Sequence, residues 1–96
     1  MVEKLNSKQR EEALGRLKGW NFDEAADCIS RVFKFKGFSE AFGFMARVAL
    51  EAQKADHHPD WSNIYDTVTI RLSTHDAGGL TQKDIALAQA IDKLLA

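Results

Sequence analysis

The sequence predicts an α+β fold in which an antiparallel sheet carries helices on one face. Apolar residues recur at three- and four-residue steps in three segments, and they alternate with polar residues in four shorter ones, which gives the order α-β-β-α-β-β-α. All connections are short, and parallel crossovers would need more chain than the hairpins leave. The 96 residues are therefore expected to form one domain over 1–96.

The first predicted helix begins after Asn6, which can cap it, and Gln9 stands at the spacing of a capping box. The helix is expected to continue until Gly19, since glycine commonly follows the last turn of a helix. Residues 20–22 are then interpreted as a brief strand.

The next strand is predicted over residues 28–36, where apolar side chains alternate with polar ones. Its apolar face consists of Ile29, Phe33 and Phe35. Arg31 interrupts that face, which indicates either an edge position or a long side chain whose charged end reaches solvent. Cys28 is the only cysteine, so an intramolecular disulfide is excluded, and it is interpreted as a small residue on a half-buried strand rather than a catalytic thiol.

The longest helix is predicted after Gly37, with Ser39 as its N-cap. Its apolar stripe is expected to consist of Phe38, Phe42, Met45, Ala49 and Ala52. Phe44 and Leu50 lie off this stripe. They indicate either a contact between subunits or the scattered apolar exposure that most protein surfaces show.

A hairpin is predicted from residues 61–65 and 68–74, followed by a turn at Gly78-Gly79 and a last helix capped by Thr81. The second strand alternates strictly, so one face of the sheet is expected to be wet. Its inward residues are Val68, Ile70 and Leu72, and the apolar stripe of the last helix is Leu87, Ala88, Ile91, Leu94 and Leu95.

Composition excludes several classes of protein. Hydrophobic residues make up 45% and charged residues 28%, which is a globular balance, and a net charge of −1 provides no field for binding nucleic acid or an anionic membrane directly. Apolar runs such as residues 48–50 are too short to span a bilayer. Because residues 1–4 lack the apolar core of a signal peptide, a cytoplasmic location is expected.

The candidate chemistry rests on the three histidines of the chain, His57, His58 and His75. If the hairpin forms, the start of its first strand and the end of its second are neighbours, which brings His75 near the other two. Imidazole titrates near neutral pH, so two such groups can serve as general acid and general base. The alternative is that each histidine is an ordinary surface residue.

Three further residues lie close to these histidines. Pro59 pushes His58 into extended geometry, so the two adjacent rings should diverge. Trp61 offers a flat surface on which a planar heterocycle could stack, although its position alone favours a place in the core. Asp84 can cap the last helix or orient a histidine. A metal site is not expected, because adjacent histidines rarely face one ion and no carboxylate or thiolate stands at a ligand spacing.

Three stretches of the sequence resemble the pterin-4a-carbinolamine dehydratase family. They are FKFKGFSEAFGFMARVAL (33–50), DHHPDWSNIYDTV (56–68) and LSTHDAGGLTQKD (72–84), and the last two contain all three histidines. The resemblance implies a four-stranded antiparallel sheet with three helices on one side, and a homodimer or homotetramer. Gln53 departs from the glutamate that animal members usually have, one helical turn before His57.

The resemblance also implies a site and a reaction. His57, His58 and His75 fall on the active-site histidines of the family, Pro59 and Trp61 match pocket residues, and Asp84 matches an acidic residue on the last helix. The implied reaction is dehydration of a 4a-hydroxytetrahydropterin, without cofactor or metal. Two other functions stay open: a dimerisation cofactor that binds a protein partner of the DNA-binding class, and a dehydratase-like protein of another pterin pathway, such as that of molybdopterin.

Overall fold

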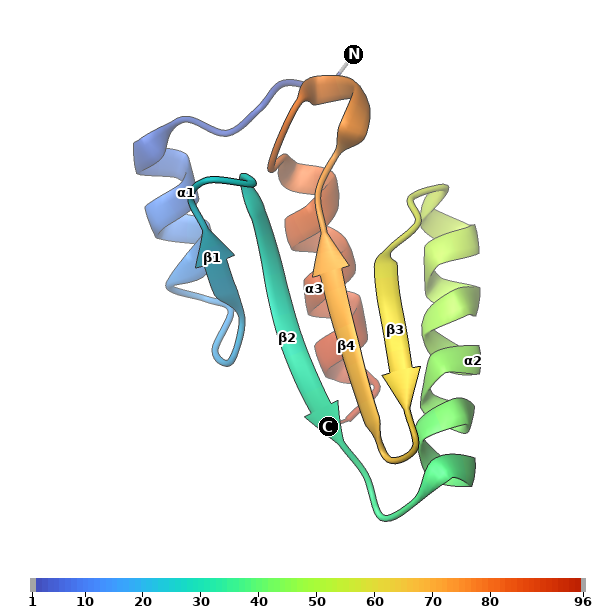
Figure 1. Cartoon of the computed structure of the whole chain (residues 1–96). Coiled ribbons are helices and arrows are strands. Elements are labelled where there is room, and N and C mark those ends of the chain that lie inside the picture. Colours follow the sequence, from blue (N-terminus) through green and yellow to red (C-terminus); the bar gives the residue numbers. More distant parts are fainter. Residues whose placement is uncertain (1, 96) are drawn as a thin grey trace.

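The fold is described by a computed structural model of the chain, which covers residues 2–95, and it consists of three helices packed on one face of a four-stranded antiparallel sheet (Figure 1). The helices are α1 (Ser7–Leu14), α2 (Phe38–Ala55) and α3 (Gln82–Lys93), with a short 3₁₀ helix η1 (His75–Ala77). The strands are β1 (Asn21–Asp23), β2 (Cys28–Lys34), β3 (Asp60–Ile64) and β4 (Thr67–Leu72). They lie in the order β1-β2-β4-β3. The predicted fold class and element order are confirmed.

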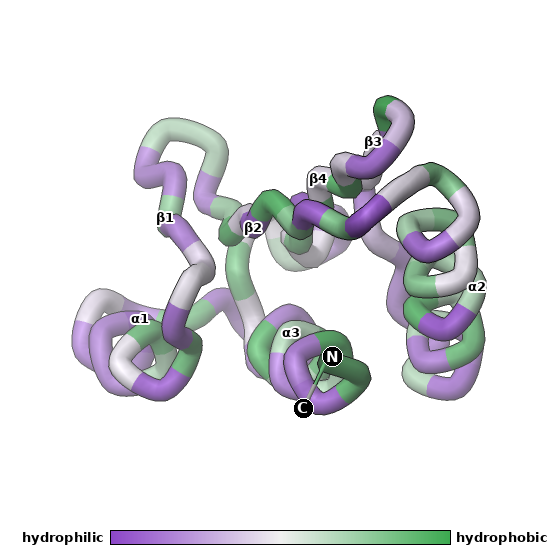
Figure 2. The backbone as a smooth tube through the Cα atoms, turned by 90° about the horizontal axis from the view of Figure 1, so that it is seen from below, coloured by the Kyte–Doolittle hydropathy of each residue, from purple (hydrophilic) through white to green (hydrophobic). Residues whose placement is uncertain are grey.

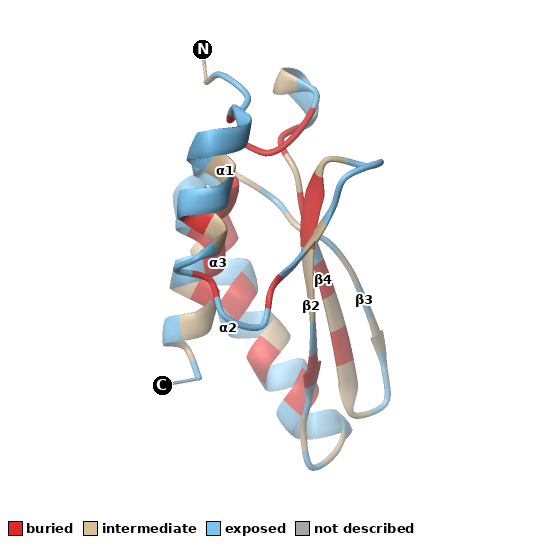
Figure 3. Ribbon diagram, turned by 90° about the vertical axis from the view of Figure 1, so that its left-hand side faces the viewer, coloured by how far each residue is buried: buried red, intermediate tan, exposed pale blue. Residues whose placement is uncertain are grey.

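The molecule has two layers. Viewed along the sheet, α3 lies between α1 and α2, and all three helices cover the same face (Figure 2). The buried residues of the helices and strands line the space between these layers, whereas the other face of the sheet carries no helix (Figure 3). Among residues 2–95, no helix is long and apolar enough to cross a membrane.

Helix α1 begins as predicted and ends earlier than predicted. The amide of Gln9 donates to Asn6 Oδ1 at 2.9 Å, and the amide of Asn6 donates to Gln9 Oε1 at 3.0 Å, so the capping box is present. The helix stops at Leu14 rather than continuing toward Gly19. Gly15 disfavours continuation of the helix, because glycine loses the most backbone freedom on folding. The turn that follows places Leu17 in the core.

Arg31 lies on the helix-facing side of β2, where it is held by a carboxylate. Strand β1 pairs only with Cys28–Ser30, so Arg31 comes just beyond the paired part of β2. Its Nη1 donates to Asp92 Oδ1 on α3 at 2.8 Å, and Trp20 Nε1 donates to the same oxygen at 2.9 Å. Since β4 pairs with β2 from Ile29 to Lys34, Arg31 has a neighbouring strand on that side, and the predicted edge position holds only on the side of β1.

Helix α2 buries only part of the stripe predicted for it, since Ala52 is buried and Met45 packs against the core. Phe44 is in the core, with its ring centroid 4.9 Å from those of Phe33 and Phe35, whereas Phe38 and Phe42 are 52% and 58% exposed. The buried residues of the helix are Ala41, Phe44, Val48 and Ala52. Ser39 is not the cap either, because the cap is Gly37, two residues earlier, and the helix begins at Phe38. The prediction was wrong for Phe38, Phe42 and Ala49, because α2 carries two apolar stripes and periodicity alone does not tell which one faces the sheet.

The hairpin forms as predicted, and its register fixes the two faces of the sheet. The inward residues Val68, Ile70 and Leu72 are fully buried. Trp61 stands opposite Ile70, so it lies on the helix-facing side, and it packs against the core. Asp60 stands opposite Arg71, which places both on the open face.

The side chain of Cys28 is buried, as the sequence suggested for a structural cysteine. Burial, and then the carboxylate of Asp23 that faces it across the β1–β2 pair, raises the pKa of the Cys28 thiol above its ordinary value. A raised pKa disfavours the thiolate, which is the reactive form, so Cys28 is poorly suited to act as a nucleophile.

Replacing Phe44 by alanine should lower the free energy of unfolding by about 3–5 kcal/mol, because the substitution leaves a cavity beneath β2. Phe42→Ala is the matched control, since Phe42 is the same residue type on the exposed face of α2. Its expected change is within about 0.5 kcal/mol. Urea unfolding at a protein concentration low enough to dissociate oligomers measures both, and equal losses would contradict the assignment of the buried face.

Candidate functional site

The three histidines come from two segments that meet at one edge of the sheet. His57 and His58 follow α2, after Asp56 turns the chain with a left-handed backbone conformation (φ 50°). His75 begins η1, shortly after β4. Because β3 and β4 are antiparallel neighbours, the start of β3 and the end of β4 lie at the same edge, and the two segments lie together there.

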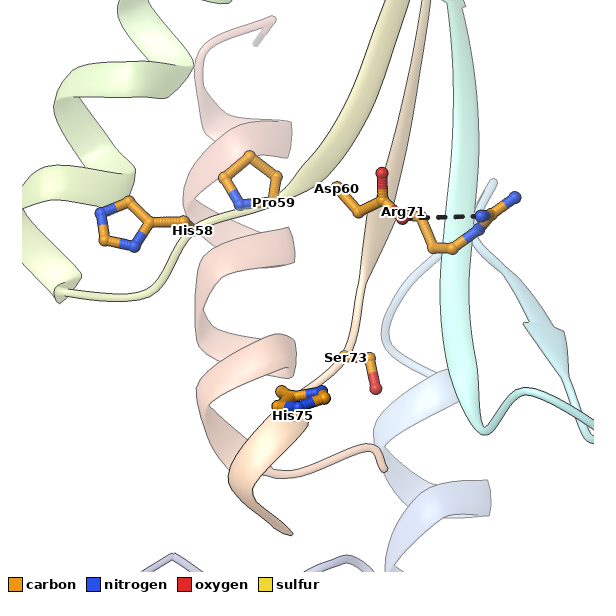
Figure 4. A pocket seen from close by; sticks show the side chains of 6 residues that line it. All are labelled: His58, Pro59, Asp60, Arg71, Ser73 and His75. Atoms are coloured by element: carbon orange, nitrogen blue, oxygen red, sulfur yellow. Dashed lines mark ion pairs between the residues drawn. The ribbon is translucent and has the colours of Figure 1, made fainter. Parts of the chain in front are cut away.

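A surface pocket of about 280 Å³ lies between these two segments (Figure 4). It is lined by His58, Pro59, Asp60, Arg71, Ser73 and His75. The imidazoles of His58 and His75 come from its two sides, and the ring of His58 is directed away from the pair formed by Asp60 and Arg71.

The pocket offers both signs of charge. Arg71 Nη1 lies 3.6 Å from Asp60 Oδ2, and both side chains are mostly exposed, at 55% and 79%. Exposed pairs of this kind add little to stability, so the two groups remain available to a ligand. A ligand that carries both hydrogen-bond donors and acceptors can pair with the two groups.

His57 does not line this pocket and is instead bound to a buried carboxylate. Its Nε2 lies 2.5 Å from Asp84 Oδ1, and the exposed fractions of the two side chains are 10% and 0%. A short bond to an ionised group is among the stronger hydrogen bonds in proteins, so the ring of His57 is held in one orientation.

Asp84 both caps α3 and holds a histidine. Its Oδ2 accepts from the amide of Thr81 at 2.9 Å, which closes the capping box of the helix, and from the hydroxyl of Thr74 at 2.8 Å. The two uses of Asp84 that the sequence left open therefore occur together. Since Thr74 directly precedes His75, the carboxylate connects His57 to the segment that carries the third histidine.

The loop that bears His75 is closed by hydrogen bonds of its own backbone and is contacted by Asp27, which comes from an earlier part of the chain. The amide of Thr74 donates to the carbonyl of Gly79 at 2.9 Å, and that of Gly79 donates back at 3.3 Å. A Cβ on Gly79 would overlap the carboxylate of Asp27, so only glycine fits there without displacement. Asp27 also forms an ion pair with Lys4 at 3.1 Å.

The site residues predicted from the sequence thus fall into three groups. His58, Pro59 and His75 line the pocket, His57 and Asp84 form a pair behind the same loop, and Trp61 packs against the core. Sequence reasoning missed the pocket residues Asp60, Arg71 and Ser73. The available signal was the outward position of Arg71 and Ser73 in the alternating strand, together with the hairpin register that sets Asp60 opposite Arg71.

Within residues 2–95, no three or more His, Cys, Asp or Glu side chains are grouped as ligands for a metal ion. The groups that could hold a ligand are the polar and imidazole side chains of the pocket.

Comparisons with known proteins identify the class to which this fold and site belong. The sequence model of the family described as "Pterin 4 alpha carbinolamine dehydratase" matches residues 3–94. A protein of Bradyrhizobium sp. (strain BTAi1 / ATCC BAA-1182) is 55% identical over 96 residues, covering 100% of this chain and 97% of its own length. One from Rhodopseudomonas palustris (strain HaA2) is 54% identical over 94 residues, covering 98% and 93%. Both carry the name "Putative pterin-4-alpha-carbinolamine dehydratase".

A solved structure agrees with these matches. The crystal structure of a "transcriptional coactivator/pterin dehydratase" from Brucella melitensis superposes with a TM-score of 0.93 at 44% identity, covering 98% of this chain and 100% of that one. The chain belongs to the pterin-4a-carbinolamine dehydratase family.

The two adjacent histidines should differ in their contribution to stability. His57→Ala removes the donor to Oδ1 of the buried Asp84 carboxylate, while Thr74 and Thr81 still donate to Oδ2, and it should lower the free energy of unfolding by about 1.5–3 kcal/mol. His58→Ala is the matched control, because that ring is exposed, and its effect should stay within about 0.5 kcal/mol. Urea unfolding at pH 7 compares them, and a loss in His58→Ala as large as that in His57→Ala would argue against the His57–Asp84 bond.

Proposed function

We propose that the protein dehydrates a 4a-hydroxytetrahydropterin to the quinonoid dihydropterin, and so recycles the pterin cofactor of aromatic amino acid hydroxylases. Membership of the family supports the substrate class. The observation that carries the proposal is the pocket with imidazoles on two sides, next to a third imidazole bound to a buried carboxylate. The proposed reaction takes place in the cytoplasm, as the sequence led us to expect.

The reaction requires one acid and one base. The base removes the proton from N5, the electron pair of that N–H bond forms the N5=C4a double bond, and the C4a–O bond breaks. Hydroxide is a poor leaving group, so the acid protonates it as it departs and water is released. Positioned acid–base catalysis contributes about 10²–10⁴-fold, a scale that suits a substrate which already dehydrates slowly without an enzyme.

We assign His57 and His75 to this acid–base pair without choosing which is which, and His58 to positioning of the pterin ring. Asp84 orients His57 through the 2.5 Å contact. Pro59 forms part of the pocket wall. Contact between the ring and Trp61 is proposed from the family resemblance alone, because Trp61 packs against the core in this chain. No cofactor or metal takes part in the proposed reaction.

Replacing His57 or His75 by alanine should reduce the rate of dehydration of 4a-hydroxytetrahydropterin by at least about tenfold, because each substitution removes one proton-transfer group. The rate is followed by stopped-flow absorbance against the uncatalysed reaction, with circular dichroism to show that each variant is folded.

Asp76→Asn is the control for the same loop, since Asp76 is exposed beside His75 and does not line the pocket. Its turnover should match that of the unchanged protein. Full turnover in both histidine variants would refute the catalytic assignment.

We further propose that the chain forms a homodimer or homotetramer through the exposed side of α2. The contact residues suggested by the sequence were Phe44 and Leu50, and Phe44 is excluded because it is buried. Phe38, Phe42 and Leu50 are 52%, 58% and 69% exposed, which is unusual for large apolar side chains on one helix. A second copy of the same helix presents an equally apolar surface, as a symmetric interface requires.

Phe42→Glu should lower the mass measured by sedimentation velocity, because it introduces a charge into the proposed apolar interface. Gln89→Glu adds the same charge to the exposed side of α3 and should leave the mass unchanged. A mass that is the same for Phe42→Glu and the unchanged protein would rule out this face of α2.

A second function is a protein-binding role, which the description of the Brucella melitensis structure as a transcriptional coactivator favours for that protein. In this chain the exposed apolar residues of α2 would then contact a different protein. A third is dehydration of another pterin, such as one of the molybdopterin pathway. Turnover of 4a-hydroxytetrahydropterin by the unchanged protein supports the first proposal, and a folded but inactive protein favours one of the other two.

A further inference from the structure

The hydrogen bonds around Asp84 fix the position of every proton in the network. Its carboxylate only accepts, and it receives contacts from His57 Nε2, the Thr81 amide and the Thr74 hydroxyl. No buried side-chain nitrogen or oxygen of residues 2–95 lacks a partner. Each donor in this network therefore has one defined acceptor.

The two threonines form a chain with a single direction. Thr74 has one hydroxyl proton, which it donates to Asp84, so the 2.6 Å contact between the Thr74 and Thr81 hydroxyls requires Thr81 to be the donor. Thr81 Oγ1 in turn accepts from the amide of Lys83 at 3.2 Å. Proton donation thus runs from the first turn of α3 through Thr81 and Thr74 to the carboxylate.

The carboxylate of Asp84 determines the tautomer of His57. Because Asp84 Oδ1 can only accept, Nε2 of His57 carries a proton, and a neutral ring has its lone pair on Nδ1. Among residues 2–95, Nδ1 makes no hydrogen bond, and since no buried nitrogen there is left unpaired, Nδ1 reaches the molecular surface. Nδ1 is therefore the ring nitrogen of His57 that has no hydrogen-bond partner among the described residues.

We infer that Nδ1 is the atom at which the His57 ring accepts a proton from the substrate or returns one to it, and that Thr74 is the positioning residue that maintains this tautomer by holding the carboxylate of Asp84. This inference rests on the proposed function and deepens it by naming the reacting atom. Thr74 is 8% exposed and does not line the pocket, so its hydroxyl acts through Asp84 rather than on the substrate.

Thr74 also influences the positions of both proposed catalytic histidines. Its hydroxyl holds the carboxylate that orients His57, while its backbone closes the loop with Gly79 from which His75 projects. One residue thus fixes the orientation of one imidazole and the attachment point of the other.

The test compares Thr74→Val, which keeps the shape of the side chain but removes the hydroxyl, with Thr74→Ser, which keeps the hydroxyl. Nitrogen-15 NMR of the imidazole reports the tautomer of His57, and steady-state kinetics report kcat and KM. Thr69→Val is the matched control, because Thr69 lies on the helix-free face of β4, the strand that precedes Thr74.

The unchanged protein should show His57 protonated at Nε2. Thr74→Val should give a mixture of tautomers and a kcat lower by about tenfold with KM little changed, since groups that orient a catalytic side chain typically contribute on this scale. Thr74→Ser should restore both readouts, and Thr69→Val should change neither.

A purely structural role for Thr74 would lower the thermal midpoint of Thr74→Val but leave the tautomer and kcat as in the unchanged protein, and that result would overturn the inference. The inference would also be overturned if His57 of the protein without substitutions were protonated at Nδ1 alone. The NMR readout needs no turnover. If the tautomer shifts as expected but no variant dehydrates the pterin, the proposed function fails while the control of the tautomer by Thr74 stands.

Discussion

The buried carboxylate of Asp84 is the constraint on which the site depends. A fully desolvated carboxylate is unfavourable unless it is neutralised or surrounded by donors, and here three donors meet it. They come from the end of α2, from the segment after β4 and from the first turn of α3. The hydrogen bonds to the carboxylate of Asp84 therefore join three separate parts of the chain. The histidines lie where those parts meet.

Much of this arrangement could be predicted from local sequence signals. The capping boxes at Asn6 and Thr81 depend on side chains three residues apart, and the β3–β4 hairpin follows from strict alternation. The meeting of the histidine segments follows from the hairpin alone. Each of these features is short in range, so no knowledge of the rest of the molecule is required.

The errors arose where a choice depends on the rest of the core. Helix α2 has two apolar stripes, and the positions of Phe33 on β2 and of Phe35 just after that strand decide that Phe44 is the buried aromatic. The pocket was incomplete for a related reason, because Arg71 looks like any outward-facing charge until the register sets Asp60 opposite it. The double use of Asp84 also depends on three-dimensional proximity, which its helix-cap spacing does not reveal.

The contact of Asp27 with the end of the histidine loop, where the amide of Leu80 donates to Asp27 Oδ1 at 3.3 Å, links that loop to the N-terminal part of the polypeptide. Lys4 holds Asp27 through an ion pair, and the amide of Leu5 donates to the carbonyl of Leu80 at 2.8 Å. The N-terminal segment is thus a brace for the loop although none of its residues lines the pocket. Shortening the N-terminal segment, or fusing a bulky protein to it, would therefore weaken the contacts that support the loop carrying His75. A fusion after α3 would leave these contacts unchanged.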